Sequence, residues 1–214
     1  MISVTKLIVG DEYSGDELRY RPGAAHMKHG ASSGRGPVVV WNMTRTCNLR
    51  CRHCYMDADG AAHAGELTTA EAKAFIEDLA AFRSPALLFS GGEPLVRQDF
   101  FELAAYARDR GVRPTLSTNG TLITPEAARK IKEVGVAYVG ISLDGLEEVN
   151  DAFRGQKGAY AAAMQGIQNC VAVGQRVGLR FTINAHNVRE LDPIFDFIEA
   201  EGINRVCFYH LVYS

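Results

Sequence analysis

The sequence has no apolar run long enough to cross a bilayer, and its beginning lacks a cationic leader followed by an apolar region and a cleavage site. It also has no large excess of charge of one sign, because 23 Lys and Arg residues stand against 25 Asp and Glu residues, for a net charge of -2. This balance excludes a broad surface for nucleic acid or anionic membranes, although it allows local charged patches. We therefore expect a cytoplasmic protein.

The sequence has only five cysteines, whereas hydrophobic residues, which can form a core, make up 47% of its 214 residues. This content excludes a disordered tail and allows one sizeable domain or two small ones. Residues 1–36 show no sustained periodicity and end in a Gly- and Ser-rich stretch, which indicates an N-terminal arm in front of a core domain at 37–214. The arm contains a cationic group that is either solvated or suited to a carboxylated substrate, namely Arg19, Arg21, His26, Lys28 and His29.

Three of the five cysteines, Cys47, Cys51 and Cys54, lie close together in the sequence. Soft thiolates select iron-sulfur clusters, zinc or copper, and clustered thiols suit a reducing compartment. Three ligands leave one iron of a four-iron cluster open to a small molecule, whereas a structural zinc site is closed by protein ligands. A zinc site with His53 or His63 as fourth ligand is the alternative, and thiolate chemistry alone does not separate the two.

From Pro37 onward, short apolar runs alternate with amphipathic segments. The predicted strands are 38–41, 86–89, 114–117, 136–141, 179–183 and 206–209. The predicted helices begin near Thr68, Asp99, Thr124, Tyr160 and Asp192, and Thr68 forms a capping box with Glu71. Most apolar runs are continuous, which favours parallel strands covered on both faces. The pattern fits either a parallel barrel or an open doubly wound sheet, with Cys170 and Cys207 as buried thiols.

The cysteine motif and the later Gly91-Gly-Glu-Pro94 resemble the radical S-adenosylmethionine (radical SAM) enzymes, from about Pro37 to the end of the chain. The resemblance implies a partial (β/α)6 barrel, a 4Fe-4S cluster on the three cysteines, and S-adenosylmethionine on the open iron. It also implies that one electron cleaves the sulfonium and releases a 5'-deoxyadenosyl radical. No residue stands out as a general base, as expected when the cofactor performs the bond cleavage.

Polar residues stand at the end of every predicted strand, where ligands of parallel α/β sheets gather. The resemblance implies that the turn of Gly91, Gly92, Glu93 and Pro94 meets the methionine amino group. It further implies contacts to the ribose or the methionine carboxylate from Ser117, Asn119, Ser142 and Asp144. For each of these residues, an ordinary turn or a strand-end hydrogen bond is the alternative.

Four further residues are candidates for binding the cofactor. Arg154 resembles an arginine that pairs with the methionine carboxylate, although a surface salt bridge is equally compatible with its position. His53 stands where the family usually has an aromatic residue whose backbone meets the adenine. Asn184 and His210 are candidates by strand-end position alone, and a structural role is the stronger interpretation for both.

The first half of the chain also resembles the tetrapyrrole-modifying branch of the family, which acts in haem d1 biosynthesis and in the siroheme-dependent haem route. The residues that carry this likeness are 1–7, 18–20, 36–42, 44–47 and 208–212. The branch implies a siroheme-derived substrate whose acetate or propionate side chains are removed or oxidised. Its members continue into a C-terminal domain with an auxiliary cluster, which these residues do not include. Without that domain we expect S-adenosylmethionine binding to persist and turnover of the large substrate to fail.

Arg45, Arg50 and Arg52 surround the cysteine loop. They suit an electron donor such as flavodoxin or ferredoxin, or else form a solvated face. Two other hypotheses stay open at this point. One is a radical SAM maturase that modifies peptides or proteins, and the other is a noncatalytic module that binds zinc or carries a cluster.

Overall fold

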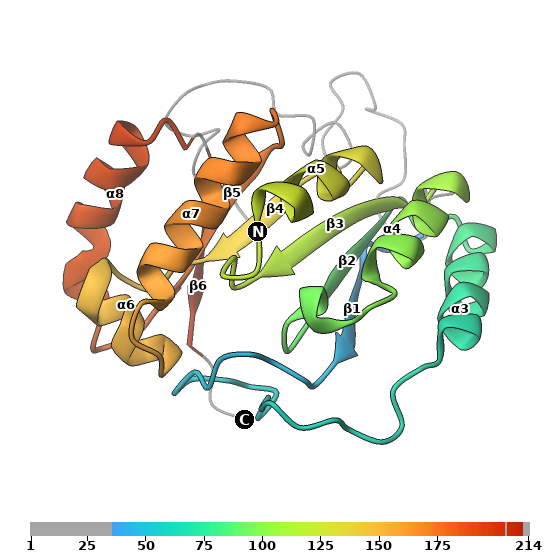
Figure 1. Ribbon diagram of the computed structural model, residues 1–214, viewed down its shortest axis with the longest axis horizontal. Helices are drawn as coiled ribbons and strands as arrows, with labels where there is room; N and C mark the ends of the chain where they lie inside the picture. Colours follow the sequence, from blue (N-terminus) through green and yellow to red (C-terminus); the bar gives the residue numbers. More distant parts are fainter. Residues whose placement is uncertain (1–35, 204, 212–214) are drawn as a thin grey trace, which may run out of the picture.

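Six parallel strands form a single sheet in the computed structural model, which describes residues 36–203 and 205–211. Each strand pairs with its neighbours in the sequence, so the order is β1-β2-β3-β4-β5-β6. Figure 1 shows the sheet running from β1 on the right to β6 on the left. The strands are β1 Val39–Thr44, β2 Ala86–Gly91, β3 Arg113–Thr118, β4 Val139–Ser142, β5 Val177–Ile183 and β6 Val206–His210.

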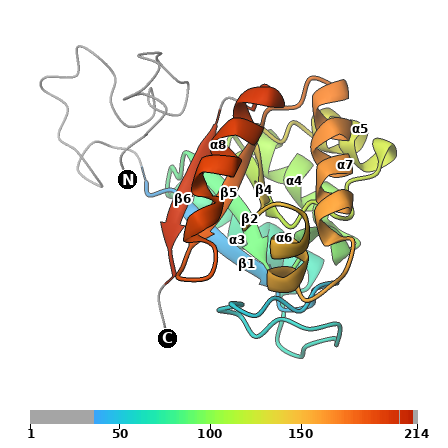
Figure 2. The ribbon, with the colours of Figure 1, turned by 90° about the vertical axis from the view of Figure 1, so that its left-hand side faces the viewer.

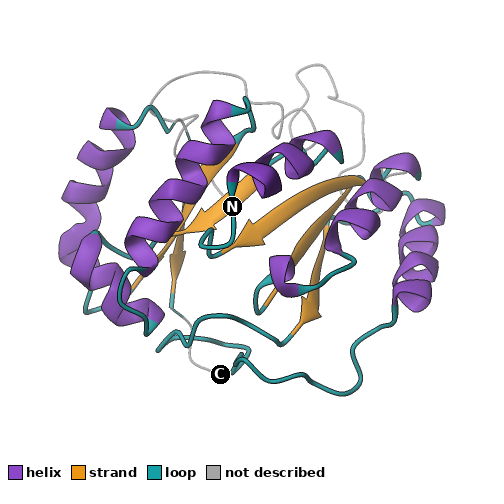
Figure 3. Ribbon diagram, viewed as in Figure 1, coloured by secondary structure: helices purple, strands orange, loops and turns teal. Residues whose placement is uncertain are grey.

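This sequential order separates the fold from a doubly wound sheet, in which the strand order reverses at a switch point. The helices lie outside the strands, as Figure 3 shows in purple and orange. The predicted partial (β/α)6 barrel is confirmed, and the doubly wound alternative is wrong. Because all strands run in one direction, their carboxyl ends meet along one edge of the barrel, which we call the rim.

The helices are α3 Thr69–Ala81, α4 Phe100–Asp109, α5 Pro125–Glu133, α6 Glu147–Arg154, α7 Ala159–Ala172 and α8 Leu191–Ala200, with short 3-10 turns η2 Pro94–Val96 and η3 Val188–Glu190. The predicted capping box is present, because the Thr68 hydroxyl accepts from the Glu71 N–H and the Glu71 carboxylate accepts from the Thr68 N–H. Helix α8 begins before the predicted position. Pro193 therefore lies in its first turn, where the N–H that proline lacks has no partner to lose.

Helix α6 is missing from the sequence-based prediction. Its N-cap residue is Leu146, which offers no side-chain hydrogen bond, so the usual polar start signal is absent. Gly155 ends the helix in the left-handed region at φ 67. A Cβ at Gly155 would lie 2.3 Å from the carbonyl oxygen of Arg50. Glycine therefore lets the end of α6 approach the cysteine loop closely.

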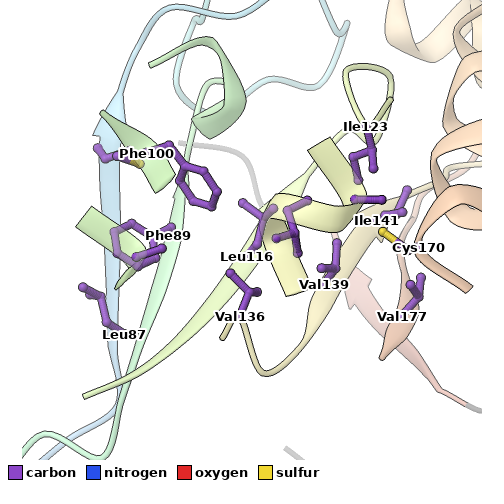
Figure 4. Close-up of a cluster of buried hydrophobic side chains, with 14 of the residues drawn as sticks. Leu87, Phe89, Phe100, Leu116, Ile123, Val136, Val139, Ile141, Cys170 and Val177 are labelled. Carbon is purple, nitrogen blue, oxygen red and sulfur yellow. The ribbon is translucent and has the colours of Figure 1, made fainter. Parts of the chain in front are cut away.

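One apolar core fills the space between the sheet and its helices (Figure 4). Phe89 of β2 meets Phe100 of α4 edge to face, with ring centroids 5.6 Å apart. Each fully buried side chain of this size contributes about 1.5–3 kcal/mol. Cys170 of α7 is completely buried here, as predicted, whereas Cys207 of β6 is only half-buried.

The other face of the sheet is the inner, concave face of the partial barrel. In Figure 2, β6 lies at the left of the sheet and helices α5 and α7 lie at the right, so these helices cover the opposite face. Val40 of β1 and the preceding Val38 are 57% and 49% exposed, so the described residues do not cover this face at β1. The concave face of this strand is open in the described part of the chain.

The predicted arm at 1–36 lies outside the described residues except for Gly36, as do the tetrapyrrole-like stretches at 1–7 and 18–20 and the residue Val212. None of the helices in the described part is long and apolar enough to span a membrane.

Candidate metal and cofactor site

The cysteine loop follows β1 and runs along the rim, at the bottom of Figure 1. The Cys47 N–H donates to the Asp59 carbonyl at 2.7 Å, which closes the base of the loop. Cys47 packs with Leu49, Ala58 and Ala159 in a small apolar cluster of its own. Cys51, Cys54 and Met56 pack against the same cluster, so the fold brings the three thiols together.

Hydrogen-bond donors point at all three sulfur atoms. The N–H of Leu49 lies 3.4 Å from Cys47 Sγ, and the N–H of Ala58 lies 3.4 Å from Cys54 Sγ. Hydrogen bonds to the sulfurs stabilise charge on thiolates and are among the features that set the potential of an iron-sulfur cluster.

Two side chains that are distant in the sequence, Asn119 just after β3 and Arg154 at the end of α6, add to this set. Arg154 Nη1 lies 3.7 Å from Cys51 Sγ, and Asn119 Nδ2 lies 3.9 Å from Cys47 Sγ. Arg154 thus brings a positive charge to the cluster of thiols. Asn119 is also tied to the loop itself, because its Nδ2 donates to Asn48 Oδ1 at 2.9 Å.

Burial raises the pKa of Cys47 to about 11, and burial also raises the pKa of Cys51, opposed there by Arg154. Burial therefore disfavours the thiolate form of both residues, and metal binding would displace their protons. The donor set, three soft sulfurs with N–H groups aimed at each, fits an iron-sulfur cluster.

Both histidines that the zinc alternative offers as fourth ligand hydrogen-bond a carboxylate through Nε2, a pairing that metal-ligating histidines also make. His63 Nε2 is hydrogen-bonded to Asp59 Oδ1 at 2.9 Å, and His53 Nε2 is hydrogen-bonded to Asp144 Oδ2 at 3.0 Å. Among the residues that the structure describes, no three His, Cys, Asp or Glu side chains are grouped to hold a single metal ion. A cluster does not need such convergence, because its thiolates bind different iron atoms.

The Gly91–Pro94 turn packs tightly against the base of the cysteine loop. Gly91 has φ 121, and a Cβ there would lie 2.4 Å from the Thr44 carbonyl oxygen. A Cβ on Gly92 would lie 2.4 Å from the Thr46 carbonyl oxygen. The two glycines are therefore required to seat this turn on the loop, whatever ligand they meet.

Glu93 is completely buried, and protein groups surround its carboxylate. The Thr118 hydroxyl lies 2.8 Å from Oε1, the Asn119 N–H donates to Oε2 at 2.8 Å, and the Leu95 N–H donates to Oε1 at 3.1 Å. Burial raises the pKa of Glu93, and these hydrogen bonds oppose the rise. The side chain thus joins the turn after β2 to the end of β3, and the backbone of the turn is left to face a ligand.

Asp144, Arg154 and His53 form a buried group beside the thiols. Asp144 Oδ2 accepts from Arg154 Nη2 at 2.5 Å and from His53 Nε2 at 3.0 Å, and Oδ1 accepts from the Thr182 N–H at 2.8 Å. Burial raises the pKa of Asp144, but Arg154 and His53 outweigh it and leave the pKa below its usual range. His53 Nδ1 and Arg154 Nε are buried and have no partner in the described part of the chain. These two atoms remain available to a ligand, which favours a cofactor beside this group.

The other candidates differ in how free their side chains are. Ser117 and Ser142 are half-buried at strand ends, and their side chains have no hydrogen bond within the described part of the chain. Asn184 closes its own turn, donating to the Thr182 carbonyl at 3.1 Å and accepting from the His186 N–H at 2.9 Å. His210 is exposed at the end of β6. The structural interpretation is therefore favoured for Asn184.

A sequence comparison with protein-family models matches residues 41–198 to the radical SAM superfamily. The chain belongs to the radical SAM superfamily. The cofactors of this superfamily are a 4Fe-4S cluster and S-adenosylmethionine.

Radical SAM relatives match along most of this chain. It is 55% identical over 217 residues to Fe-coproporphyrin III synthase of Methanosarcina barkeri, covering 100% of this chain and 54% of the relative. It is 47% identical to pre-heme d1 synthase of Dinoroseobacter shibae, covering 83% and 44%. Mycofactocin maturase MftC of Mycobacterium tuberculosis is 40% identical, covering 72% and 39%. The chain thus spans about half the length of these relatives.

Among solved radical SAM structures, anSMEcpe with bound AdoMet and a peptide superposes with a TM-score of 0.70 at 19% identity, covering 82% of this chain and 51% of that one. SuiB of Streptococcus suis bound to S-adenosylmethionine gives a TM-score of 0.71 at 15% identity, covering 83% and 41%. At these identities the likeness shows the fold alone.

Several polar residues of this radical SAM rim were missed in the sequence. Asn187 is completely buried and donates to the carbonyl oxygens of Asp144 and Thr182 at 3.0 and 2.9 Å. Asn150 accepts from the Asp144 N–H at 3.0 Å. Asn150 stands four residues before Arg154, so a helix prediction at α6 would have placed both on one helical face. No sequence pattern marks Asn187.

The three arginines around the radical SAM cysteine loop, Arg45, Arg50 and Arg52, are all exposed. Their contact with an electron donor stays a prediction.

Proposed function

We propose that this chain is the cofactor-binding part of a radical SAM enzyme and acts on side chains of a siroheme-derived tetrapyrrole. Cys47, Cys51 and Cys54 would hold a 4Fe-4S cluster, and S-adenosylmethionine would occupy its open iron. When bound, these groups supply one electron and a 5'-deoxyadenosyl radical that abstracts a hydrogen atom from the substrate.

The protein's own share of this work is positioning and electrostatics. Arg154 is held by Asp144 and presents its remaining N–H groups beside Cys51, where it would receive the methionine carboxylate. The Gly91–Pro94 backbone would receive the methionine amino group. Ser117 and Ser142 have hydroxyls without protein partners in the described residues, and these would meet the ribose.

The observation that carries the tetrapyrrole substrate is the 55% identity to Fe-coproporphyrin III synthase along the whole chain. The likeness to pre-heme d1 synthase points to the same class of substrate. The proposal includes reduction by flavodoxin or ferredoxin at the exposed arginines of the cysteine loop. It also includes a cytoplasmic location, where thiols stay reduced until they bind metal.

A peptide or protein substrate is the second candidate. It is favoured by the 40% identity to mycofactocin maturase MftC over 72% of the chain. This identity is lower and covers less of the chain than the match to Fe-coproporphyrin III synthase.

The test begins with anaerobic reconstitution and analysis of iron and sulfide. The protein is then incubated with S-adenosylmethionine and a strong reductant, with and without a siroheme derivative, and 5'-deoxyadenosine is measured. We expect iron with sulfide, cofactor cleavage, and a rise in cleavage when the derivative is present. Zinc without sulfide would contradict the radical mechanism, and cleavage that responds only to a peptide would favour the maturase.

A further inference from the structure

The concave face of the sheet has a polar region that the cofactor site does not use. On β5, Leu179 and Phe181 point into the core, so Arg180 between them points to the concave face. Arg180 is paired in register with Ser142 at the end of β4. Arg180 therefore faces the barrel interior, and because its stem lies over Gly140, its side chain runs from the level of Ser142 toward the amino ends of the strands, away from the rim.

Two paired glycines make room for large side chains at this place. Gly140 of β4 is the register partner of Gly178 of β5. A Cβ on Gly140 would lie 2.8 Å from Arg180 Cδ, and one on Gly178 would lie 2.3 Å from the Tyr138 hydroxyl oxygen. Arg180 and Tyr138 thus lie flat against the sheet, which any other residue at the two glycine positions would prevent.

The two side chains extend into a larger group of arginines and tyrosines. The Arg180 guanidinium lies 4.9 Å from the Tyr209 ring centroid, and that of Arg205 lies 4.8 Å from the Tyr138 ring centroid. Arg113, the first residue of β3, lies near enough to Arg205 for their charges to repel. We call Arg113, Tyr138, Arg180 and Tyr209 the arginine–tyrosine patch.

The patch has positive charge and free donors but no carboxylate of its own. Neither Arg113 nor Arg180 has an ion-pair partner in the described part of the chain. Arg113 Nε and the Tyr138 hydroxyl are buried, and no hydrogen-bond partner for either lies among those residues. Burial, followed by the charges of Arg176 and Arg205, lowers the pKa of Arg113. Buried donors without acceptors are rare in proteins, so each of these atoms needs an acceptor from a water, an ion or a ligand.

We propose that the arginine–tyrosine patch binds a side-chain carboxylate of the substrate inside the barrel. Guanidinium groups bind carboxylates through charge-assisted, paired hydrogen bonds, and the Tyr138 hydroxyl adds a further donor. On the same face, the exposed Val38 and Val40 offer an apolar surface to the ring of a macrocycle. A flat apolar ring with carboxylates at its edge matches this combination. The inference rests on the proposed function and names the contacts that the substrate would make.

The test is a fluorescence titration of the reconstituted chain with coproporphyrin III, a metal-free tetracarboxylate macrocycle, in the absence of S-adenosylmethionine and reductant. We expect Arg180→Met to weaken binding about tenfold, as loss of one charge-assisted hydrogen bond predicts. Arg180→Lys keeps the charge and should retain most of the binding. Tyr138→Phe should cost about threefold. Methionine keeps the apolar stem that lies over Gly140, so Arg180→Met should fold.

Arg129→Met is the matched control, because Arg129 is exposed on α5, on the outer side of the barrel, and pairs with Glu126 at 2.7 Å. It removes the same charge and should leave binding unchanged. The tetramethyl ester of the same porphyrin should bind wild type and Arg180→Met equally. Equal binding of coproporphyrin III to wild type and Arg180→Met, or an equal loss in Arg129→Met, would overturn the inference. So would a wild type that binds an acidic peptide but not the porphyrin.

The inference about the patch and the proposed function can be refuted independently of each other. If wild type cleaves S-adenosylmethionine but the patch variants bind the porphyrin normally, the inference alone is wrong. If no cluster assembles and no cofactor is cleaved, the proposed function is wrong, whatever the titration gives.

Discussion

At the rim of the barrel the buried charges have protein partners, whereas the half-buried Arg113 and Arg180 on the concave face have no ion-pair partner among the described residues. The carboxylates of Glu93 and Asp144 each accept several hydrogen bonds, and Arg154 is paired with Asp144. Arg113 and Arg180, in contrast, face no carboxylate in the described part of the chain. The polar side chains at the rim are therefore held in place before a ligand binds. This suits a cofactor that is common to the whole superfamily. Single buried atoms of His53 and Arg154 stay unpaired at the rim, but on the concave face Arg113 and Arg180 lack a counter-charge among the described residues, which suits a charged group that differs from one enzyme to another.

The largest effect is expected from the thiols of the rim. Cys51→Ser should abolish both the colour of the reconstituted protein and the cleavage of S-adenosylmethionine, because a cluster with only two cysteine ligands is not retained. Absorbance, iron content and 5'-deoxyadenosine report the loss. Cys207→Ser, which changes a half-buried thiol on β6, is the control and should keep the colour. Full cleavage by Cys51→Ser would refute the assignment.

The next largest effect is expected from the pairing of charges at the rim. Asp144→Asn leaves the buried Arg154 without its counter-charge, which should lower the free energy of unfolding by about 3–5 kcal/mol. Chemical denaturation of the metal-free protein measures this change. Glu126→Gln breaks the exposed pair with Arg129 and should give no measurable change. A similar result for both variants would remove the distinction between a preorganised rim and an ordinary surface.

The close packing of the rim gives a third prediction. Gly91→Ala places a Cβ against the Thr44 carbonyl oxygen at a positive φ, and it should cost about 2 kcal/mol or more. Gly111→Ala, at φ 78 with nothing within 4 Å, bears only the conformational cost of about 1 kcal/mol. Denaturation curves of both variants compare the two costs. Equal losses would show that the turn after β2 does not need close contact with the cysteine loop.

The lowered pKa of Asp144 predicts how stability depends on pH. A carboxyl group with a pKa lower in the folded than in the unfolded chain contributes stability above the unfolded value, near 4, and loses it as the pH falls through the folded value. The stability difference between wild type and Asp144→Asn should therefore be constant from about pH 7 to 5 and shrink below about pH 4. Denaturation at a series of pH values tests this, and a difference that grows on acidification would contradict it.

The smallest effect is expected on the concave face, and it has the opposite sign. Arg113→Met removes a half-buried guanidinium that repels Arg176 and Arg205, so stability should be unchanged or slightly raised. A loss of stability as large as that of Asp144→Asn would mean that Arg113 is already satisfied in the free protein. The contrast between rim and concave face would then fail.

The sequence by itself determined the six strands, five of the six α-helices of the described part, and the presence of a site for a soft metal or a cluster. Thr68 and Glu71 marked a helix start through a local capping box, and the spacing of Cys47, Cys51 and Cys54 indicated a metal site, because both signals lie within a few neighbouring residues. The apolar runs placed Ser142 and Asp144 at a strand end, and hence at the rim.

Only the tertiary structure decided which of these groups are already occupied. Glu93 looked like a ligand contact but is enclosed by Thr118 and Asn119, from a different strand. Arg113 and Arg180 are 67 positions apart in the sequence and share one face only because β3, β4 and β5 pair in a particular register. Such register is set by long-range packing of the core, so no local pattern contains it.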